Sequence, residues 1–381
     1  MISVIIPTHN RAPTLRNCLI SLRKLAGETD FEVVVVLNNC SDESAAVVAE
    51  FEFANAYQES ATAFTRARDA GAHHARGDFL VFIDDDTIMG PGSLRRIASV
   101  FSQYSECGII AGRIQPVYEA EPPAWLEQLQ SKKNGLSLYE PIASNDAEAV
   151  FEVKGACGPL MAIRSEVYSL CGGFPPDTLG VETNKGEGLF SKIYIGPGDY
   201  GLAELVKRRG WKILYSPGIS VGHVIPPMRL TRAFWLSRYF GEGCYLAIAD
   251  KEFWEMSILG RMKKIFVAVL RVAPRVYRER ELRPDPEGRG VSVEELEVFQ
   301  SLAYILVGFA ILRNRRLSAM LWRAGKIGVS DAEFKGFMDK IPLSFLRLIS
   351  IDWDLVAASS LPYSSTIAAV AADPRFSIIR R

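Results

Sequence analysis

The sequence predicts an α/β protein built on a mostly parallel, Rossmann-like sheet flanked by helices. Three apolar runs support this prediction: residues 2–7 (ISVIIP), 31–37 (FEVVVVL) and 79–83 (FLVFI). Each has the length of a strand and is continuous enough to be buried on both faces. Because stretches with helical patterns separate the runs, we expect right-handed crossovers and parallel pairing.

The remaining elements follow from local patterns. Between the three runs, leucines at helical spacing predict a helix over residues 13–25, and further helices are expected over 41–52 and 62–75. Beyond them we expect strands at 109–114, within 150–163 as a short pair, and at 211–216, with a helix over 200–209. Residues 175–197 are rich in glycine, proline and polar side chains, which predicts a loop over the site.

Composition indicates a globular chain with a sizeable core. The 381 residues are 48% hydrophobic and 23% charged, and the length favours two units. Lys+Arg and Asp+Glu both number 44, and this balance argues against a dedicated nucleic-acid binder. Counted along the chain, residues 1–224 have a net charge of −7 and residues 225–381 of +7. We therefore expect two parts that meet different environments, one over 1–224 and a mainly helical, basic one over 225–381.

The six cysteines are scattered and form no CxxC pair, so neither a zinc framework nor a disulfide scaffold is indicated. Reduced thiols are the simplest interpretation. No cationic segment precedes an apolar stretch at the N-terminus, so we expect no secretion signal and a cytoplasmic protein.

Three adjacent carboxylates, Asp84, Asp85 and Asp86, follow the third apolar run directly. Like charges repel, and desolvation strengthens the repulsion, so a cation is expected there. Oxygen ligands suit Mg²⁺ or Mn²⁺, which commonly bridge to phosphate oxygens. In parallel sheets, ligands bind at the carboxyl ends of the strands, which is where this triplet lies. The alternative is a solvated acidic turn.

Other polar groups have structural alternatives as well as functional ones. The segments after the first two strands, PTHNR and NNCSD, could hydrogen-bond a base and a ribose or could simply form turns and helix caps. Asp199 could act as a general base or as a helix cap. His223 could ligate a metal or be a satisfied structural histidine.

Five blocks together resemble the family 2 glycosyltransferases, which have the GT-A fold. The blocks are SVIIPTHNR, FEVVVVLNNCSDES, RARDAGAHHARGDFLVFIDDD, KGACGPLMAIRSEVYSLCGGF and GPGDYGLAELVKRRGWKILYSPGISVGH. They occur in the family's order over roughly residues 1–224, so the resemblance implies a GT-A catalytic domain over 1–224. It does not extend to the last third of the chain.

The resemblance implies a donor site for a nucleotide sugar. The positions implied to contact the donor are Pro7, Thr8, Arg11, Asn38, Asp42, Arg68, Asp84, Asp85, Gly155 and Ala156. The first five flank base and ribose, and Arg68 approaches the base or diphosphate. The first two aspartates of the triplet contact nucleoside or ribose. The small pair Gly155 and Ala156 lies beside the sugar and acceptor.

The resemblance also implies the chemical groups. Asp86 would hold the metal, with His223 as an extra metal or diphosphate ligand, and Asp199 would deprotonate the acceptor hydroxyl. Two departures from the family pattern stand out. Asn38 occupies the place of the usual acid after the second strand, and Gly198 replaces the glutamate that usually precedes the base.

The expected activity is inverting transfer of a hexosyl group from a nucleotide sugar, with a UDP-sugar favoured, to a hydroxyl of a saccharide or lipid-linked saccharide, assisted by Mn²⁺ or Mg²⁺. The alternative is a non-catalytic sugar-nucleotide-binding or scaffold protein of the same fold, which the glycine at position 198 keeps open. A dehydrogenase is disfavoured because GxGxxG is absent after the first strand. A nucleotidyltransferase would need a glycine-rich basic loop there, and PTHNRAPT is not one.

Residues 256–283 combine eight basic side chains with apolar ones at amphipathic spacing. Such helices can lie on anionic membranes, so peripheral contact through residues 256–316, at the inner face of the membrane, is one expectation. The other is a helical subdomain packed on the catalytic domain with its basic residues facing water.

Overall fold

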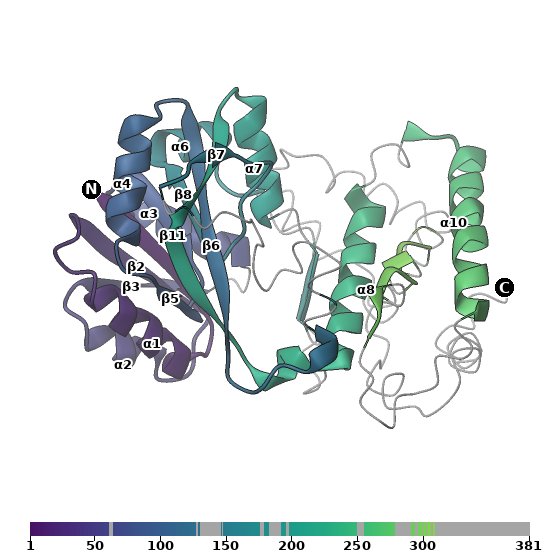
Figure 1. Cartoon of the computed structure of the whole chain (residues 1–381), viewed down its shortest axis with the longest axis horizontal. Coiled ribbons are helices and arrows are strands. Elements are labelled where there is room, and N and C mark those ends of the chain that lie inside the picture. The colour runs from purple at the N-terminus through teal and green to yellow at the C-terminus, as the bar shows by residue number, and fades with distance from the viewer. Residues whose placement is uncertain are drawn as a thin grey trace. The chain divides into compact units, whose positions relative to one another are not determined.

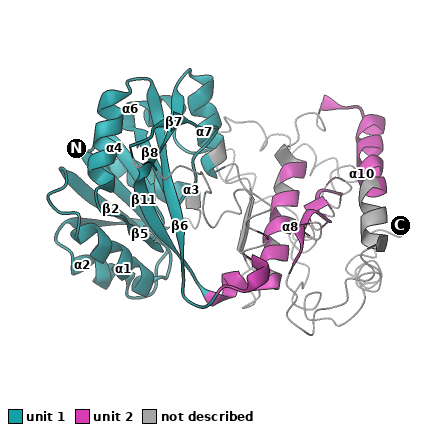
Figure 2. Ribbon diagram, in the orientation of Figure 1, with its two compact units in different colours: residues 1–121, 133–177, 197–226 teal, residues 122–132, 178–196, 227–381 magenta. Residues whose placement is uncertain are grey.

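The structure is a computed structural model. It describes residues 1–60, 64–126, 129, 146, 148–175, 179–182, 192–195, 198–249, 255–278 and, between 291 and 308, residues 291–293, 296–298, 300–301, 303–305 and 308. The chain divides into two compact units (Figure 2). The first comprises residues 1–121, 133–177 and 197–226, and the second comprises 122–132, 178–196 and 227–381. All candidate site residues belong to the first unit.

The first unit alternates strands and helices along most of its length (Figure 1). Its elements are β1 (Ile2–Thr8), α1 (Ala12–Arg23), β2 (Phe31–Asn38), α2 (Ser44–Ala49), β3 (Ala54–Glu59), α3 (Phe64–His74), β4 (Phe79–Ile83), β5 (Thr87–Met89), α4 (Ser93–Gln103), β6 (Cys107–Tyr118), β7 (Phe151–Glu152), β8 (Leu160–Arg164), α6 (Ser165–Cys171), α7 (Gly198–Arg208) and β11 (Lys212–Ile225).

One nine-stranded sheet organises this unit, in the order β3-β2-β1-β4-β8-β6-β11-β5, with β7 paired to β11. Strands β1 to β4, β6 and β11 run in one direction, and β8 runs against both of its neighbours. The predicted α/β class, with a largely parallel sheet, is therefore confirmed. The antiparallel β8 makes the sheet mixed.

The register of the central strands determines where the polar segments meet. Thr8 pairs with Leu37, so the segments that follow β1 and β2 emerge side by side. Strand β4 pairs with β1 from Phe79 to Phe82. The acidic triplet begins at Asp84, directly after the last residue of β4. Carboxyl ends of parallel strands share one edge of a sheet, so three polar segments converge there.

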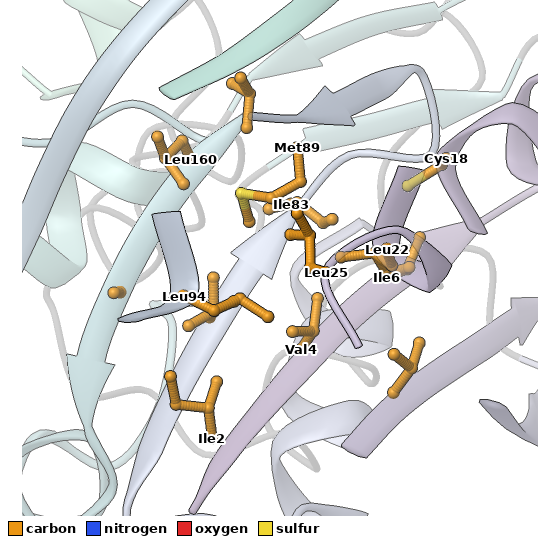
Figure 3. Packing of buried hydrophobic residues seen from close by; sticks show 14 of the residues in the cluster. Ile2, Val4, Ile6, Cys18, Leu22, Leu25, Ile83, Met89, Leu94 and Leu160 are labelled. Atoms are coloured by element: carbon orange, nitrogen blue, oxygen red, sulfur yellow. The ribbon is translucent and has the colours of Figure 1, made fainter. Parts of the chain in front are cut away.

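The core fills both faces of the sheet because side chains alternate along each strand. On one face, Ile2, Val4 and Ile6 pack with Leu22, Leu94 and other apolar side chains of α1 and α4 (Figure 3). On the other face, Ile5 packs with buried residues from α3, α6 and α7. Each such aliphatic side chain contributes about 1.5–3 kcal/mol on burial, so the central strands form a rigid platform.

Helix α3 lies unusually close to β1. A Cβ built at Gly71 would come 2.4 Å from Ile5 Cγ2, so only glycine permits this approach. The close contact fixes the height of α3 over the sheet, and Arg68 lies one turn earlier on the same helix. Gly71 therefore helps to position Arg68.

Several predicted elements differ from the structure in their extent. Strand β3 was not predicted, because its sequence ANAYQE lacks an apolar run and none of its residues is fully buried. Helix α2 is shorter than the expected 41–52. Strand β11 extends well past residue 216, beyond a register shift between Ser216 and Ser220, and therefore includes His223.

The second unit contains β9 (Leu179–Glu182) and β10 (Lys192–Ile195), an antiparallel pair within the segment expected to be a loop. It continues with the 3₁₀ helix η1 (Pro227–Leu230), α8 (Arg232–Ala249) and α10 (Ile258–Arg278). Of the helices that the structure describes, none combines the length and hydrophobicity needed to cross a bilayer. The predictions for residues 309–316 lie outside the described residues.

Candidate active site

The acidic triplet after β4 is held by groups from the end of β1. Asp85 accepts hydrogen bonds from Thr8 Oγ1 and Arg11 Nη1, both at 2.7 Å. The second arm of Arg11 donates to Asp86 Oδ2 at 2.9 Å. One guanidinium therefore bridges two adjacent carboxylates, and its side chain, 36% exposed, lies at the solvent side of both.

Burial raises the pKa of Asp85 to about 7, because Arg11 and the Thr8 hydroxyl offset only part of the desolvation. Burial likewise raises the pKa of Asp84, although Arg68 opposes this shift. Both shifts have the same physical origin, since negative charge is crowded into a poorly solvated site.

Arg68 connects the triplet to α7. This buried side chain donates to Asp84 Oδ1 at 2.9 Å and to the carbonyl oxygen of Gly158 at 3.0 Å, and it forms an ion pair with Asp199. Its guanidinium also lies over the Phe174 ring, 5.4 Å from the centroid. The structure thus brings Asp199 and the triplet together through one guanidinium, although they are far apart in the sequence.

Gly158 is a site residue that the motifs did not single out. A Cβ at this position would come 2.6 Å from Asp199 Oδ2 and 2.8 Å from Arg68 Nη2. Only glycine allows the loop before β8 to supply its carbonyl while the Arg68–Asp199 pair lies against it. The residue stands in the GACGP segment, but nothing in that segment reveals the close approach.

Asp199 lies in the first turn of α7, where the helix dipole favours a negative charge. The preceding Gly198 has φ of +34°, a conformation that L side chains rarely adopt. This backbone geometry gives a physical reason for the departure from the Glu-Asp pattern, because glutamate would be strained at position 198.

His223 reaches the triplet from β11. Its Nε2 lies 3.5 Å from Asp86 Oδ1, and both side chains are buried. Pairing of His223 with Thr87 of β5 and a hydrogen bond from Val224 N to Asp86 O (2.8 Å) hold the two segments together. The two residues predicted to ligate a metal are therefore neighbours.

The donor set of Asp86 and His223 suits a divalent cation in part. Carboxylate oxygen and imidazole nitrogen are accepted ligands of Mn²⁺. Among the described residues, no group of three or more His, Cys, Asp or Glu side chains is arranged to hold a metal ion. A cation bound here would need the remaining ligands from a substrate and water, as Mg²⁺ and similar ions commonly do in phosphate sites.

The predicted base-binding segments are tied to each other. His9 Nδ1 donates to the carbonyl oxygen of Asn38 at 2.7 Å, and Asn10 Oδ1 accepts from Ser41 N at 2.7 Å. Asn10 and Asn39 have φ of 53° and 50°, in the left-handed region that asparagine tolerates. These contacts make a defined rim beside the buried Asn38. The sequence includes His9 and Asn10 in the PTHNR segment but gives neither an individual role.

Some predicted residues have evident structural roles. Asp42 accepts from Ala12 N at 2.9 Å and from Ser44 N and Oγ, and so ties the starts of α1 and α2 together. Pro7 pairs within the sheet opposite Val36, and Ala156 packs in the core on the α3 side, next to the half-buried Gly155. The site network consists of two groups of contacts, which the backbone between Asp84 and Asp85 joins: one of Thr8, Arg11, Asp85, Asp86 and His223, and one of Arg68, Asp84 and Asp199.

Comparison with known proteins agrees with the motifs. The model of Glycosyl transferase family 2 matches residues 3–169. An uncharacterized glycosyltransferase of Haemophilus influenzae is 30% identical over 176 residues, which cover 45% of this chain and 56% of that protein. An N-acetylglucosaminyltransferase of Mesorhizobium japonicum is 28% identical over 238 residues, 59% of this chain and 51% of that protein. The chain spans about half the length of these curated relatives.

Two solved structures show a weaker likeness. GalNAc-T7 with UDP, GalNAc and Mn²⁺ has a TM-score of 0.43 and 14% identity, covering 65% of this chain and 50% of that one. The mannosyltransferase PcManGT from Pyrobaculum calidifontis, in complex with GDP-Man and Mn²⁺, has a TM-score of 0.44 and 17% identity, covering 98% and 87%. Both scores are too low to bear on substrate or metal. The sequence comparisons, in contrast, support the resemblance, and residues 3–169 are accordingly similar to glycosyl transferase family 2, as the motifs predicted.

Proposed function

We propose that this protein is an inverting glycosyltransferase that moves a hexosyl group from a nucleotide sugar to an acceptor hydroxyl. The observation that carries the proposal is the contact of Arg68 with both Asp84 and Asp199. It places a candidate proton acceptor next to the carboxylates that follow β4, on a sheet whose sequence resembles family 2 enzymes.

Charge in the site favours a divalent cation as cofactor. Counted in their ionised forms, four carboxylates (Asp84, Asp85, Asp86 and Asp199) exceed the two guanidinium groups by two negative charges, and a cation would favour those ionised forms against the raised pKa values of Asp84 and Asp85. Asp86 and His223 would hold Mn²⁺ or Mg²⁺. The bound ion would stabilise negative charge on the departing diphosphate.

Asp199 would act on the acceptor. The acceptor oxygen attacks the anomeric carbon while the bond from that carbon to the diphosphate oxygen breaks. The proton of the acceptor hydroxyl passes to Asp199, and the nucleoside diphosphate leaves. Attack on the face opposite the leaving group inverts the configuration at the anomeric carbon. Arg68 would keep the carboxylate of Asp199, the proposed general base, oriented.

The donor would lie along the ends of β1, β2 and β4. The nucleobase and ribose would be flanked by Pro7, Thr8, Arg11, Asn38 and Asp42. Arg11 is the most exposed cationic group among these residues, so its outer side is open to this part of the donor. Gly155 and Ala156 would lie near the sugar. A UDP-sugar is favoured, and UDP-N-acetylglucosamine is worth testing because one relative is named for that group.

The acceptor is proposed to be a saccharide or a lipid-linked saccharide of a polysaccharide or glycoconjugate. Peripheral contact with the inner face of a membrane through residues 256–316 belongs to the same proposal, because a lipid-linked acceptor would lie at that surface.

A thermal-shift screen of UDP-, GDP- and dTDP-sugars with Mn²⁺ tests donor binding, since a ligand that binds the native state raises Tm. Release of nucleoside diphosphate from the best donor then tests catalysis. We expect one nucleotide to stabilise the protein only with the metal, and turnover to stop in EDTA. Absence of stabilisation by every donor, in a well-folded sample, would exclude the proposed site.

A non-catalytic sugar-nucleotide-binding protein is the second candidate. The observation that favours it is the engagement of Asp199 by Arg68, which would have to loosen before the carboxylate could accept a proton. Donor binding without any hydrolysis or transfer, across a panel of acceptors, would support this candidate over the enzyme.

A further inference from the structure

Helix α10 presents its apolar face to solvent. Ile258, Leu259, Met262, Phe266 and Leu270 recur at helical spacing and are 53–77% exposed. Ile265, which lies at the margin of these residues seven positions after Ile258, is fully buried. These five exposed residues form an apolar stripe, the α10 face.

The basic side chains of α10 are not distributed as in an ordinary amphipathic helix of a globular protein. In a helix of a globular protein, the apolar stripe faces the core and the charged residues face water. Here Arg261 and Lys264 are only partly exposed, and Arg261 Nε donates to the carbonyl oxygen of Met256 at 3.1 Å. Among the described side chains of α10, the five apolar residues are therefore more exposed than Arg261 and Lys264, which is not expected for a helical subdomain with its basic residues facing water. A contiguous apolar surface of this kind marks an interaction site.

The charge of the helix identifies the kind of partner. The sequence of α10 has six basic residues and no acidic one between Ile258 and Arg278. Lys263 is exposed beside the apolar stripe. A second copy of this chain on the same face would bring two strongly cationic helices together, which like-charge repulsion disfavours. An anionic lipid surface complements both the charge and the apolar stripe.

We propose that the α10 face docks on the surface of an anionic bilayer, with its five apolar side chains among the acyl chains and Lys263 at the headgroups. This inference deepens the membrane part of the proposed function, because it names the residues and the lipid charge. Docking itself requires neither donor nor catalysis.

Flotation of the full-length protein with vesicles tests the inference. Vesicles of phosphatidylcholine containing phosphatidylglycerol should carry the protein upward, whereas phosphatidylcholine alone should carry much less, and raised salt should weaken binding. The double variant Leu259→Ser/Phe266→Ser should lower the partition coefficient by at least about tenfold. Both side chains are exposed, so the fold should tolerate the changes.

The matched control is Leu170→Ser, a change at an apolar residue that is 58% exposed on α6. It should float like the wild type. Equal flotation of the double variant, or no flotation of the wild type, would overturn the inference. Light scattering that shows a dimer, which the double variant converts to a monomer, together with no flotation, would assign the face to a second copy instead.

Donor hydrolysis, measured on the same preparations without vesicles, separates this inference from the catalytic proposal. A protein that hydrolyses donor but does not float contradicts membrane docking alone. A protein that floats but neither binds nor hydrolyses donor contradicts the catalytic proposal alone.

Discussion

His223 Nε2 lies 3.5 Å from Asp86 Oδ1 inside the first unit, although the two residues come from distant parts of the sequence. The pairing of β11 with β5 sets this distance, because His223 is in register with Thr87, the residue after Asp86. Both side chains are buried, so their mutual position depends on the sheet rather than on flexible loops.

Substitution of His223 by alanine should weaken metal binding more than it lowers the stability of the fold. We expect the Mn²⁺ concentration for half-maximal donor hydrolysis to rise by roughly 10-fold or more, because a ligand or its close partner is lost. Titration of activity with Mn²⁺ after EDTA treatment measures this. His73→Ala, at an exposed position on α3, is the control and should leave the titration unchanged. An unaltered metal requirement in His223→Ala would remove this histidine from the cation site.

The variant Asp199→Asn should retain donor binding and lose transfer. An amide keeps the shape of the side chain but cannot accept the acceptor proton, so kcat should fall by roughly 10²–10⁴-fold while the donor Kd changes little. Calorimetry with the nucleotide and a transfer assay report the two quantities separately. Glu204→Gln, a change at a partly exposed position on the same helix, is the control. Substantial turnover in Asp199→Asn would place the base elsewhere.

Gly158→Ala should impair activity by displacing the Arg68–Asp199 pair. The added methyl would meet Asp199 Oδ2 at 2.6 Å, so both side chains must shift. We expect at least about a tenfold loss of kcat, because small displacements of a catalytic group are costly. The comparison is Gly172→Ala, where φ is +77° but no atom lies within 4 Å of the new Cβ. That variant should lower stability through backbone strain and keep kcat. If both variants lose the same activity, the close contact at Gly158 has no special role.

The buried carboxylate of Glu32 should make stability depend on acid pH. Burial alone would raise its pKa, but hydrogen bonds from Ser3 and Arg76 outweigh burial and lower the pKa below its usual value. Because the folded-state pKa is the lower one, the stabilisation is complete above the unfolded-state value of about 4.3. It is lost as the pH falls through the folded-state pKa.

Urea unfolding of Glu32→Gln measures this contribution. At neutral pH the variant should lose roughly 1 kcal/mol of unfolding free energy, and the difference from the wild type should shrink as the pH falls below about 4. Glu52→Gln, at an exposed position nearby in the sequence, should show little loss at either pH. A difference that is constant with pH would mean that Glu32 stabilises by packing alone.

The central strands were predictable because their residues alternate between two buried faces. Runs such as FEVVVVL have no other stable placement, and the acidic triplet at the end of such a run indicates the functional edge of the sheet. Strand β3 was not predictable because it lies at the edge of the sheet and therefore needs few apolar residues.

The contacts within the site were not predictable in the same way. Arg68 has no local feature that marks it as buried, and its partners Asp84, Gly158 and Asp199 come from three different segments. The family resemblance singled out Arg68 and Asp199 separately, but only the folded sheet shows that they meet. The exposure of the apolar side of α10 could not be predicted either, because an amphipathic pattern does not reveal which side of a helix faces the rest of the protein.

The place of β8 between β4 and β6 has a consequence for biosynthesis. Neither neighbour can pair with it until the ribosome has passed residue 164, and β6 gains its other partner only when β11 has emerged. Long-range pairing of this kind is slow and leaves strand edges open for a time. Since His223 is part of that last strand of the sheet, the nascent chain completes its sheet and the proposed cation site in one late step.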